Sequence, residues 1–339
     1  MDYHRYPRNV VEDIARLRRR IESSMIPAKV TERNLIIASW NIRSLGRIYD
    51  SYDENTGSPK RNLRGLAYIA EIIQHFDIVA IQEVKGDMTG VRKLQEWLGP
   101  DWGVIFTDVT LGALGNNERL TFLFDSRRVT PSGLAGEIVL PPTERGDPVK
   151  QFARSPYAVG FQAYGESLVL VTAHIYYGRS RDDRVGEISA LAEHVAEEMH
   201  ARALKGKFEE GSIIVLGDFN TDKRGDDPLF RAFTATGLTV PPPLRKLRTA
   251  LGKEPKYYDQ IAWFMDDFDL IPTGRCGVID FSGAVYPELT LHQMSFRVSD
   301  HFPLWVEFNL DHSEEIMAET LGLDPGMPHP LDSVPDLSE

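Results

Sequence analysis

The chain has 339 residues, of which 42% are hydrophobic and 26% are charged. These proportions exclude a fibrous or wholly disordered protein, and they provide enough apolar material for one large core or two smaller ones. The formal net charge of -12 excludes long-range attraction of polyanions, so a phosphate-bearing substrate would need local basic groups or bound cations.

The sequence contains no recognisable targeting segment. The first residues lack the unbroken apolar stretch of a signal peptide, and no segment has the roughly eighteen consecutive apolar residues of a membrane span. Cys276 is the single cysteine, so it cannot form an internal disulfide. That suits a reducing compartment, and we expect Cys276 to be small buried filler. We therefore expect a soluble, cytoplasmic protein without a membrane span.

Residues 1–33 predict one amphipathic helix that is basic, with eight Lys or Arg and five acids. The apolar positions at helical spacing are Val10, Ile14, Leu17, Ile21 and Met25. Asn9, with Glu12 three residues later, predicts the N-cap. The arginines of the segment are Arg16, Arg18, Arg19 and Arg20. They could contact nucleic acid or an anionic membrane, but we favour a solvated face above an apolar stripe that docks on the body.

Between residues 34 and 310, short apolar segments interleave with helical patterns. The predicted strands are "LIIASW", "DIVAIQ", "GVIFTD", "LTFLFD", "YAVGFQA", "SLVLVTA", "SIIVLG", "QIAWFM" and "LWVEFNL". The predicted helices are "NLRGLAYIAEIIQHF", "VRKLQEWL", "DRVGEISALAEHVAEEMHARAL" and "DPLFRAFTATG". Because no long linker interrupts this alternation, we predict one α/β domain.

Three polar segments stand apart from this alternation. The insertion "RSLGRIYDSYDENTGSPKRN" contains Arg43, Arg47, Lys60 and Arg61 and predicts a mobile loop that could contact a ligand. A second segment, "PPPLRKLRTALGKEPKYYD", is basic and could also influence substrate choice, although a solvated surface is an equal alternative. Residues 311–339 hold eight acids and no Lys or Arg, and we expect most of this tail to be disordered.

Polar residues follow several of the predicted strands. They are Asn41, Glu83, His174, Asp218 and Asn220, while Asp259 and the pair Asp300 and His301 precede two further strands. Polar side chains at strand ends in α/β sheets tend to line ligand crevices. Carboxylate and amide oxygens suit Mg²⁺ or Mn²⁺ better than Zn²⁺. A histidine beside a carboxylate suits general acid-base chemistry, so the set points to metal-assisted phosphate chemistry.

Six motifs in order resemble the endonuclease/exonuclease/phosphatase family, and most closely its deoxyribonuclease I-like branch. They are "ASWNIRSL", "DIVAIQEV", "VTAHIYYG", "VLGDFNTD", "YYDQIAW" and "VSDHFPLWVEF". "NERLTFLFDSRRV" and "FARSPYAVGF" also fit that branch. The resemblance covers residues 34–310. It implies a four-layer α/β sandwich, in which helices flank two packed mixed β-sheets, and Mg²⁺- or Mn²⁺-dependent phosphodiester hydrolysis with nucleic acid, namely DNA, as substrate.

The resemblance also implies roles for individual residues. The implied metal ligands are Glu83, Asn41 and Asp300. Asp259 would orient His301, and Glu118 would orient His174. Asp218 and Asn220 would position the attacking water and the phosphate. The residues that would meet the nucleic-acid backbone are Arg43, Lys85 and Arg154, with Lys85 at a position where the family often has arginine.

Alternatives remain open at this point. Individually, Asn41 could be a turn residue, His174 a core histidine and Glu118 a surface acid. The fold could also serve a phosphatase or phosphodiesterase that acts on a phospholipid, inositol phosphate or nucleotide. A non-catalytic binding module is a further alternative, although the complete set of acid and histidine residues argues against it. The disulfides of secreted nucleases of this type are absent, so we carry over the chemistry but not the secretory biology.

Overall fold

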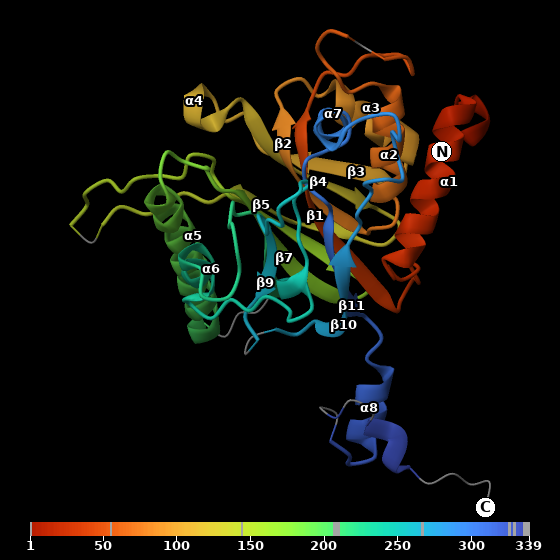
Figure 1. Cartoon of the computed structure of the whole chain (residues 1–339). Coiled ribbons are helices and arrows are strands. Elements are labelled where there is room, and N and C mark those ends of the chain that lie inside the picture. The colour runs from red at the N-terminus through yellow and green to blue at the C-terminus, as the bar shows by residue number, and fades with distance from the viewer. Residues whose placement is uncertain are drawn as a thin grey trace, which may run out of the picture.

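Two mixed β-sheets pack face to face in the computed structural model (Figure 1), which describes residues 2–54, 56–143, 145–205, 211–265, 268–324, 327 and 330–334. The first sheet contains, in spatial order, β10 (Ile271–Val278), β11 (Leu304–Asn309), β1 (Asn34–Leu45), β2 (Ile78–Lys85), β4 (Glu118–Asp125) and β3 (Trp102–Phe106). The second contains β5 (Thr130–Glu137), β6 (Tyr157–Ala163), β7 (Glu166–His174), β8 (Ser212–Asp218) and β9 (Asp259–Trp263). Only the pairs β1–β2 and β7–β8 are parallel among these described strands.

The alternation of side chains along β1 explains why the first sheet has two buried faces. Leu35 and Ile37 belong to the core that contains both sheets, whereas Ile36 and Ala38 belong to the core beneath the first helices. The helices on that outer face are α1 (Arg8–Ser23), α2 (Leu63–Ile73) and α3 (Thr89–Leu98). The second sheet is covered by α5 (Arg181–Lys205) and α6 (Pro228–Thr234). This arrangement confirms the predicted four-layer sandwich.

Helix α1 docks on the body through the predicted apolar stripe. Val10 and Leu17 are fully buried. The helix begins at Arg8 after Pro7, so the predicted N-cap at Asn9 is wrong; proline's fixed φ suits the start of a helix. Met25 was expected on the stripe, but it lies beyond the helix end and is 80% exposed.

The arginines of α1 mostly contact the protein itself. Arg18 Nε lies 2.6 Å from Glu71 Oε1 on α2. Arg16 Nε donates to the carbonyl of Ala284 at 3.2 Å, and Arg20 donates to the carbonyl of Ser282. These contacts favour the docked helix over a nucleic-acid or membrane surface.

Two edge strands have no counterpart in the sequence-based prediction. Strand β5 has the sequence "TPSGLAGE" and is largely exposed, and β10 has the sequence "IPTGRCGV". Proline and glycine are tolerated at sheet edges but erase the period-two pattern from which a strand is recognised. Cys276 on β10 is partly exposed rather than buried filler.

The loop after β1 is more tightly held than its composition suggests. Arg61 was expected to be available to a ligand, but it is only 3% exposed. Burial lowers the pKa of its guanidinium to about 10. It donates hydrogen bonds to the backbone carbonyls of Arg43, Ser44, Arg297 and Val298. Arg61 therefore ties this loop to the segment before His301.

The acidic tail contains two short helices in its described part. Helix α8 spans Ser313–Thr320, and the 3-10 helix η3 spans Pro330–Ser333. The prediction of disorder for residues 325–326, 328–329 and 335–339 lies outside the described residues. A search of the described helices for an apolar span of bilayer length finds none.

Candidate active site

The candidate site lies where the ends of the two sheets meet. In the second sheet, His174 at the end of β7 is in register with Asp218 at the end of β8, which is in register with Asp259 at the start of β9. In the first sheet, Glu118 at the start of β4 pairs with Lys85 at the end of β2. The sheet registers therefore fix the relative positions of side chains that are far apart in sequence.

Asn41 and Glu83 reach the site because their strands are irregular there. The register between β1 and β2 shifts after Asn41, and the register between β2 and β4 shifts between Ile81 and Val84. Glu83 lies within that second irregularity with a φ of 61°, a left-handed conformation uncommon for a non-glycine residue. Bulges of this kind redirect side chains at the edges of active sites.

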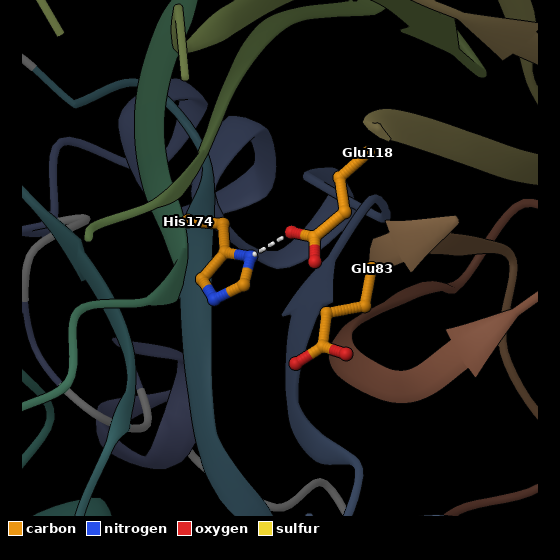
Figure 2. A group of neighbouring side chains, drawn as sticks. All are labelled: Glu83, Glu118 and His174. Carbon is orange, nitrogen blue, oxygen red and sulfur yellow. Dashed lines mark ion pairs between the residues drawn. The ribbon is translucent and has the colours of Figure 1, made fainter. Parts of the chain in front are cut away.

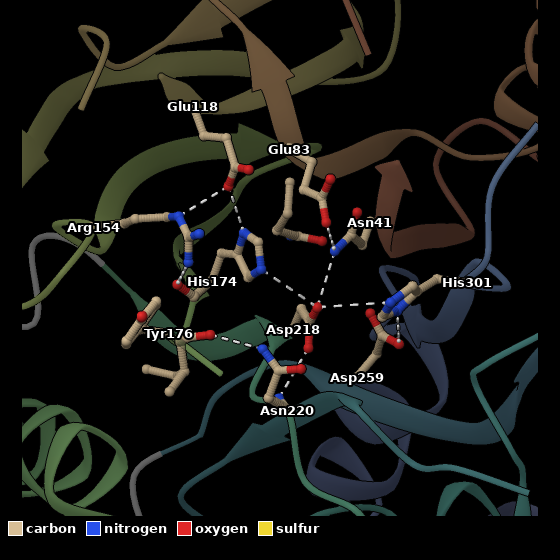
Figure 3. A network of polar contacts seen from close by, with 12 residues as sticks. Asn41, Glu83, Glu118, Arg154, His174, Tyr176, Asp218, Asn220, Asp259 and His301 are labelled. Carbon is tan, nitrogen blue, oxygen red and sulfur yellow. Dashed lines mark hydrogen bonds and ion pairs between the residues drawn. The ribbon is translucent and has the colours of Figure 1, made fainter. Parts of the chain in front are cut away.

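Asn41 connects the two sheets. Its Nδ2 donates to Glu83 Oε1 at 3.1 Å and to Asp218 Oδ2 at 2.9 Å (Figure 3). The opposite amide orientation would turn an oxygen toward two carboxylates, so the assignment of the nitrogen is physically determined. Asn41 Oδ1 is then buried with no hydrogen-bond partner among the described residues. An unpaired buried amide oxygen is a suitable ligand for a hard cation.

Glu118 anchors His174. Figure 2 shows the ion pair between Glu118 and His174. Glu118 Oε2 lies 2.9 Å from His174 Nδ1 and 2.9 Å from Arg154 Nε. Its Oε1 accepts a hydrogen bond from Lys85 Nζ at 3.0 Å. Burial alone would raise the pKa of Glu118, but the hydrogen bond and charge of His174, with Arg154 and Lys85, lower it to about 2. Glu118 is therefore ionised, and its nearby cations make it a poorer metal ligand than Glu83.

His301 forms the second histidine–carboxylate pair. Its Nδ1 lies 2.8 Å from Asp259 Oδ2, and its backbone carbonyl accepts a hydrogen bond from Trp40 Nε1 at 2.8 Å. Burial would lower the pKa of His301, but the charges of Asp259 and Asp218 raise it well above its ordinary value. Burial raises the pKa of Asp259 against the opposing charge of His301. The pair thus retains a proton at neutral pH, with the charge on the imidazole.

Asp218 occupies the space between the two imidazoles. Its Oδ2 lies 3.6 Å from His174 Nε2 and 3.8 Å from His301 Nε2 (Figure 3). Its Oδ1 accepts the backbone N–H of Asn220 at 2.9 Å. Burial opposes its ionisation, but the charges of His301 and His174 lower the pKa of Asp218. Asn220 in turn donates from Nδ2 to the carbonyl of Ile175 at 2.7 Å.

Among the residues that the structure describes, two groups of side chains have ligand atoms close enough to share a metal ion. Each group has one ligand atom per residue, and these atoms lie within 4.8 Å of one another. The groups are Glu83, Glu118 and His174, and Asp218, Asp259 and His301. The second group already shares a proton between His301 and its carboxylates. The oxygen donors of Glu83 and Asn41 therefore fit a divalent cation best.

Asp300 and Arg43 lie at one side of the site. Asp300 Oδ2 is 3.3 Å from Arg43 Nη1, and Asp300 belongs to neither of the two groups that could hold a metal among the described residues. The structure therefore brings the other predicted site residues together, while Asp300 and Arg43 pair with each other at one side. Their catalytic roles stay predictions.

Several supporting residues escaped the sequence analysis. The ring of Tyr258 lies 5.6 Å from that of His301, and Ser299 Oγ accepts the backbone N–H of His301 at 3.0 Å. Arg224 donates from Nη2 to the carbonyl of Asp259 at 2.9 Å. The aromatic pair in "YYDQ" was a usable signal for Tyr258. Arg224 had no such signal, because its partner is a backbone carbonyl far along the chain.

Comparisons with known proteins agree with this geometry. A model of the "Endonuclease/Exonuclease/phosphatase family" matches residues 38–301. The chain is 30% identical over 295 residues to a protein named Deoxyribonuclease from Thioalkalivibrio sp. (strain K90mix), with 81% of this chain and 71% of the relative covered. It is 25% identical over 293 residues to Deoxyribonuclease-1 of Bos taurus, with 80% and 92% covered.

Solved structures share the fold at lower identity. The mannosyl-6-phosphatase Bt3783 of Bacteroides thetaiotaomicron VPI-5482 has a TM-score of 0.53 and 20% identity, with 81% of this chain and 99% of that chain covered. D. rerio TDP2, in complex with a single strand DNA product, has a TM-score of 0.52 and 16% identity, with 81% and 99% covered. At these identities the likeness extends to the fold alone.

Proposed function

Because this chain belongs to the endonuclease/exonuclease/phosphatase family, we propose that it is a Mg²⁺- or Mn²⁺-dependent phosphodiesterase that cuts DNA internally. One observation carries the proposal: the two histidine–carboxylate pairs converge on Asp218 beside Asn41 and Glu83. The deoxyribonuclease names of the two sequence relatives favour DNA as the substrate.

Glu83 and the free amide oxygen of Asn41 would hold the divalent cation. When bound, this cation would offset negative charge on the phosphoryl group. Ser44 N–H donates to Glu83 Oε2 at 3.0 Å and fixes the carboxylate. We assign Asp300 to the orientation of Arg43, with which it forms an ion pair. The orientation of the water and the transfer of protons would be carried out by the protein's own side chains.

The two histidine–carboxylate pairs would have different roles in acid-base catalysis. His301 is cationic, so it would donate a hydrogen bond from Nε2 to the phosphate or a proton to the leaving oxygen. Asp218 is ionised and would orient the attacking water. His174 has its Nδ1 held by Glu118, so its Nε2 would accept the proton of the water. The negative charge of Glu118 would stabilise the imidazolium that forms.

Lys85 and Arg154 stay predicted phosphate contacts that also hold Glu118. Arg154 donates from Nη1 to the carbonyl of His174 at 3.3 Å. Both cations would steady the Glu118–His174 pair while presenting positive charge to an incoming phosphate. This double role explains how an acidic protein can present a local cationic face.

The direct test is a nicking assay on supercoiled plasmid with Mg²⁺ or Mn²⁺, with and without EDTA. We expect metal-dependent nicking, and we expect His301→Ala to lower the rate by about 10²-fold or more because a general acid is lost. The matched control is His4→Ala, since His4 is exposed in the N-terminal 3-10 helix.

Circular dichroism would verify that both variants are folded. Folded protein that leaves the plasmid intact would overturn the nuclease assignment and direct attention to small phosphoesters and lipids. Equal loss of nicking in both variants would contradict the role of His301.

A further inference from the structure

A hollow of about 470 Å³ lies beside the catalytic group and is called the α7 hollow here, after helix α7 (Leu291–Ser295). Its volume falls in the range of about 300–1,000 Å³ that is typical of small-molecule sites. The residues that line the hollow include Arg43, Leu251, Lys253, Leu291, His292 and Asp300. The roles proposed above leave the hollow itself without a ligand.

The α7 hollow shares its wall with the site. Arg43 follows the proposed metal ligand Asn41 by two residues, and Asp300 immediately precedes His301. The backbone N–H of Leu251 donates to the carbonyl of Asp300 at 2.6 Å. A group bound in the hollow would therefore be a direct neighbour of a phosphate held between His301 and Asn41.

Arg43 is held in a fixed orientation at the wall of the hollow. Its guanidinium lies over the ring of Phe296 at 3.9 Å, and its Nη1 donates to Ser295 Oγ at 2.7 Å. The same Nη1 pairs with Asp300, while Nε and Nη2 have no hydrogen-bond or ion-pair partner among the described residues. An arginine fixed in this way retains a planar edge that can bind a phosphate through two hydrogen bonds.

The charge of the α7 hollow distinguishes it from two other hollows of the protein. Arg43 and Lys253 outnumber its single acid, Asp300. A larger hollow of about 670 Å³ beside α4 (Gly112–Gly115) is balanced, because two bases face two acids there. An apolar cavity of about 340 Å³ lies between the second sheet and α5, away from the catalytic group. Among these three hollows, only the α7 hollow combines net positive charge, apolar walls and contact with the candidate active site.

We propose that the α7 hollow is a subsite for the nucleotide next to the scissile phosphate. Arg43 and Lys253 hold the neighbouring phosphate, and the side chains of Leu251 and Leu291 cover the sugar and base. This inference rests on the proposed function and deepens it, because it specifies a substrate that continues beyond the cleaved bond. A polynucleotide strand meets that requirement, whereas a phosphomonoester does not.

The test separates binding of a neighbouring nucleotide from the chemical step. Lys253→Glu and Leu291→Glu place a carboxylate in the hollow, and neither residue belongs to the proposed catalytic group. Glutamate in the first turn of α7 is compatible with the helix. Arg19→Glu is the control, since it changes the charge on the exposed face of α1 by as much as Lys253→Glu does and by more than Leu291→Glu.

Each protein is assayed on an oligonucleotide and on bis(p-nitrophenyl) phosphate, a diester with no second phosphate. We expect both hollow variants to raise KM for the oligonucleotide by about tenfold, which corresponds to loss of one phosphate contact, with kcat and the small-diester rate unchanged. Arg19→Glu should change none of these. An unchanged oligonucleotide KM in both hollow variants would overturn the subsite.

A binding measurement without metal provides a second readout. Thymidine 3′,5′-bisphosphate is titrated into parent and variants in EDTA by calorimetry. We expect weaker binding to both hollow variants than to the parent and to Arg19→Glu. Equal binding to all four proteins, or no binding to the parent, would contradict the subsite. Failure of the proposed function is distinguishable, because the parent would then hydrolyse neither diester.

Discussion

At the scale of single residues, the most informative feature is the buried proton of the His301–Asp259 pair. Asp259 is fully buried, and its carboxylate stabilises the imidazolium of His301 at 2.8 Å. Burial alone would favour neutral groups, but the mutual attraction of the two charges outweighs it for His301. The position of His301 between two buried carboxylates thus favours its cationic form.

This feature predicts the pH dependence of activity. Because the pKa of His301 is raised, its cationic form persists above neutral pH and is lost as pH rises through the raised value. Asp259→Asn removes the largest charge that raises this pKa, so the alkaline limb of the kcat/KM profile should move to lower pH. Asp300→Asn, which removes a carboxylate with a weaker effect on the pKa of His301, should move it less. If the alkaline limb of the kcat/KM profile lay at the same pH in Asp259→Asn as in the parent, His301 would not be the group that titrates there.

At the scale of secondary-structure elements, α1 is joined to the body by a buried ionic network as well as by its apolar stripe. Asp13 is 1% exposed, and its Oδ2 lies 2.6 Å from Arg64 Nη2 on α2. The same oxygen accepts the hydroxyl of Tyr68 and the backbone N–H of Tyr286. Helix periodicity identifies the stripe but gives no sign of this network, because the partners lie on other elements.

The neighbouring acids Glu12 and Asp13 provide a matched test of that network. Asp13→Ala removes one of the two carboxylates that pair with the buried Arg64, the other being Glu288, and it also removes the acceptor of Tyr68 and of the Tyr286 N–H. It should lower the free energy of unfolding by about 3 kcal/mol. Glu12→Ala removes only the exposed pair with Arg8 and should change it by less than about 0.5 kcal/mol. Urea unfolding of the two variants measures both values. Similar values for the two would show that α1 contributes little through Asp13.

At the scale of the whole molecule, an acidic protein with a net charge of -12 presents a local cationic site. Many of its bases are already paired within the chain: Arg248 with Asp280, Lys256 with Asp222, and Lys85 and Arg154 with Glu118. The cations near the site that could meet a substrate are therefore few, namely Lys85 and Arg154 beside Glu118 and Arg43 and Lys253 at the α7 hollow. Binding of DNA should therefore rely on a small number of phosphate contacts and on the divalent cation.

The salt dependence of KM tests this view. With about two or three phosphate contacts, log KM for duplex DNA should rise with log [NaCl] with a slope of about 2 to 3 at constant Mg²⁺. A protein with six or more such contacts would give a slope of about 5 or steeper. Initial rates over roughly a fourfold range of NaCl provide the measurement. A slope of the steeper kind would indicate a cationic surface beyond the residues considered above.

The sequence predicted the architecture and most of the residues that meet at the candidate site, whose roles stay predictions. Strongly patterned segments such as "SIIVLG" and "DIVAIQ" became β8 and β2, and the polar residues after them reached the site. The edge strands β5 and β10 were missed, because exposed strands interrupted by proline and glycine carry no apolar alternation. The expected availability of Arg61 was wrong for a related reason, since burial of a cation by backbone carbonyls leaves no local sequence pattern.

By itself the sequence determined which chemical groups are present and at which strand ends they stand. Both depend on local sequence patterns and motifs. Only the tertiary structure decided how those groups are used. Sheet register and two bulges place Asn41 between Glu83 and Asp218, Asp300 turns to Arg43, and α7 completes a hollow beside the site. Charge, burial and hydrogen bonding depend on distances between residues remote in sequence, and folding alone sets those distances.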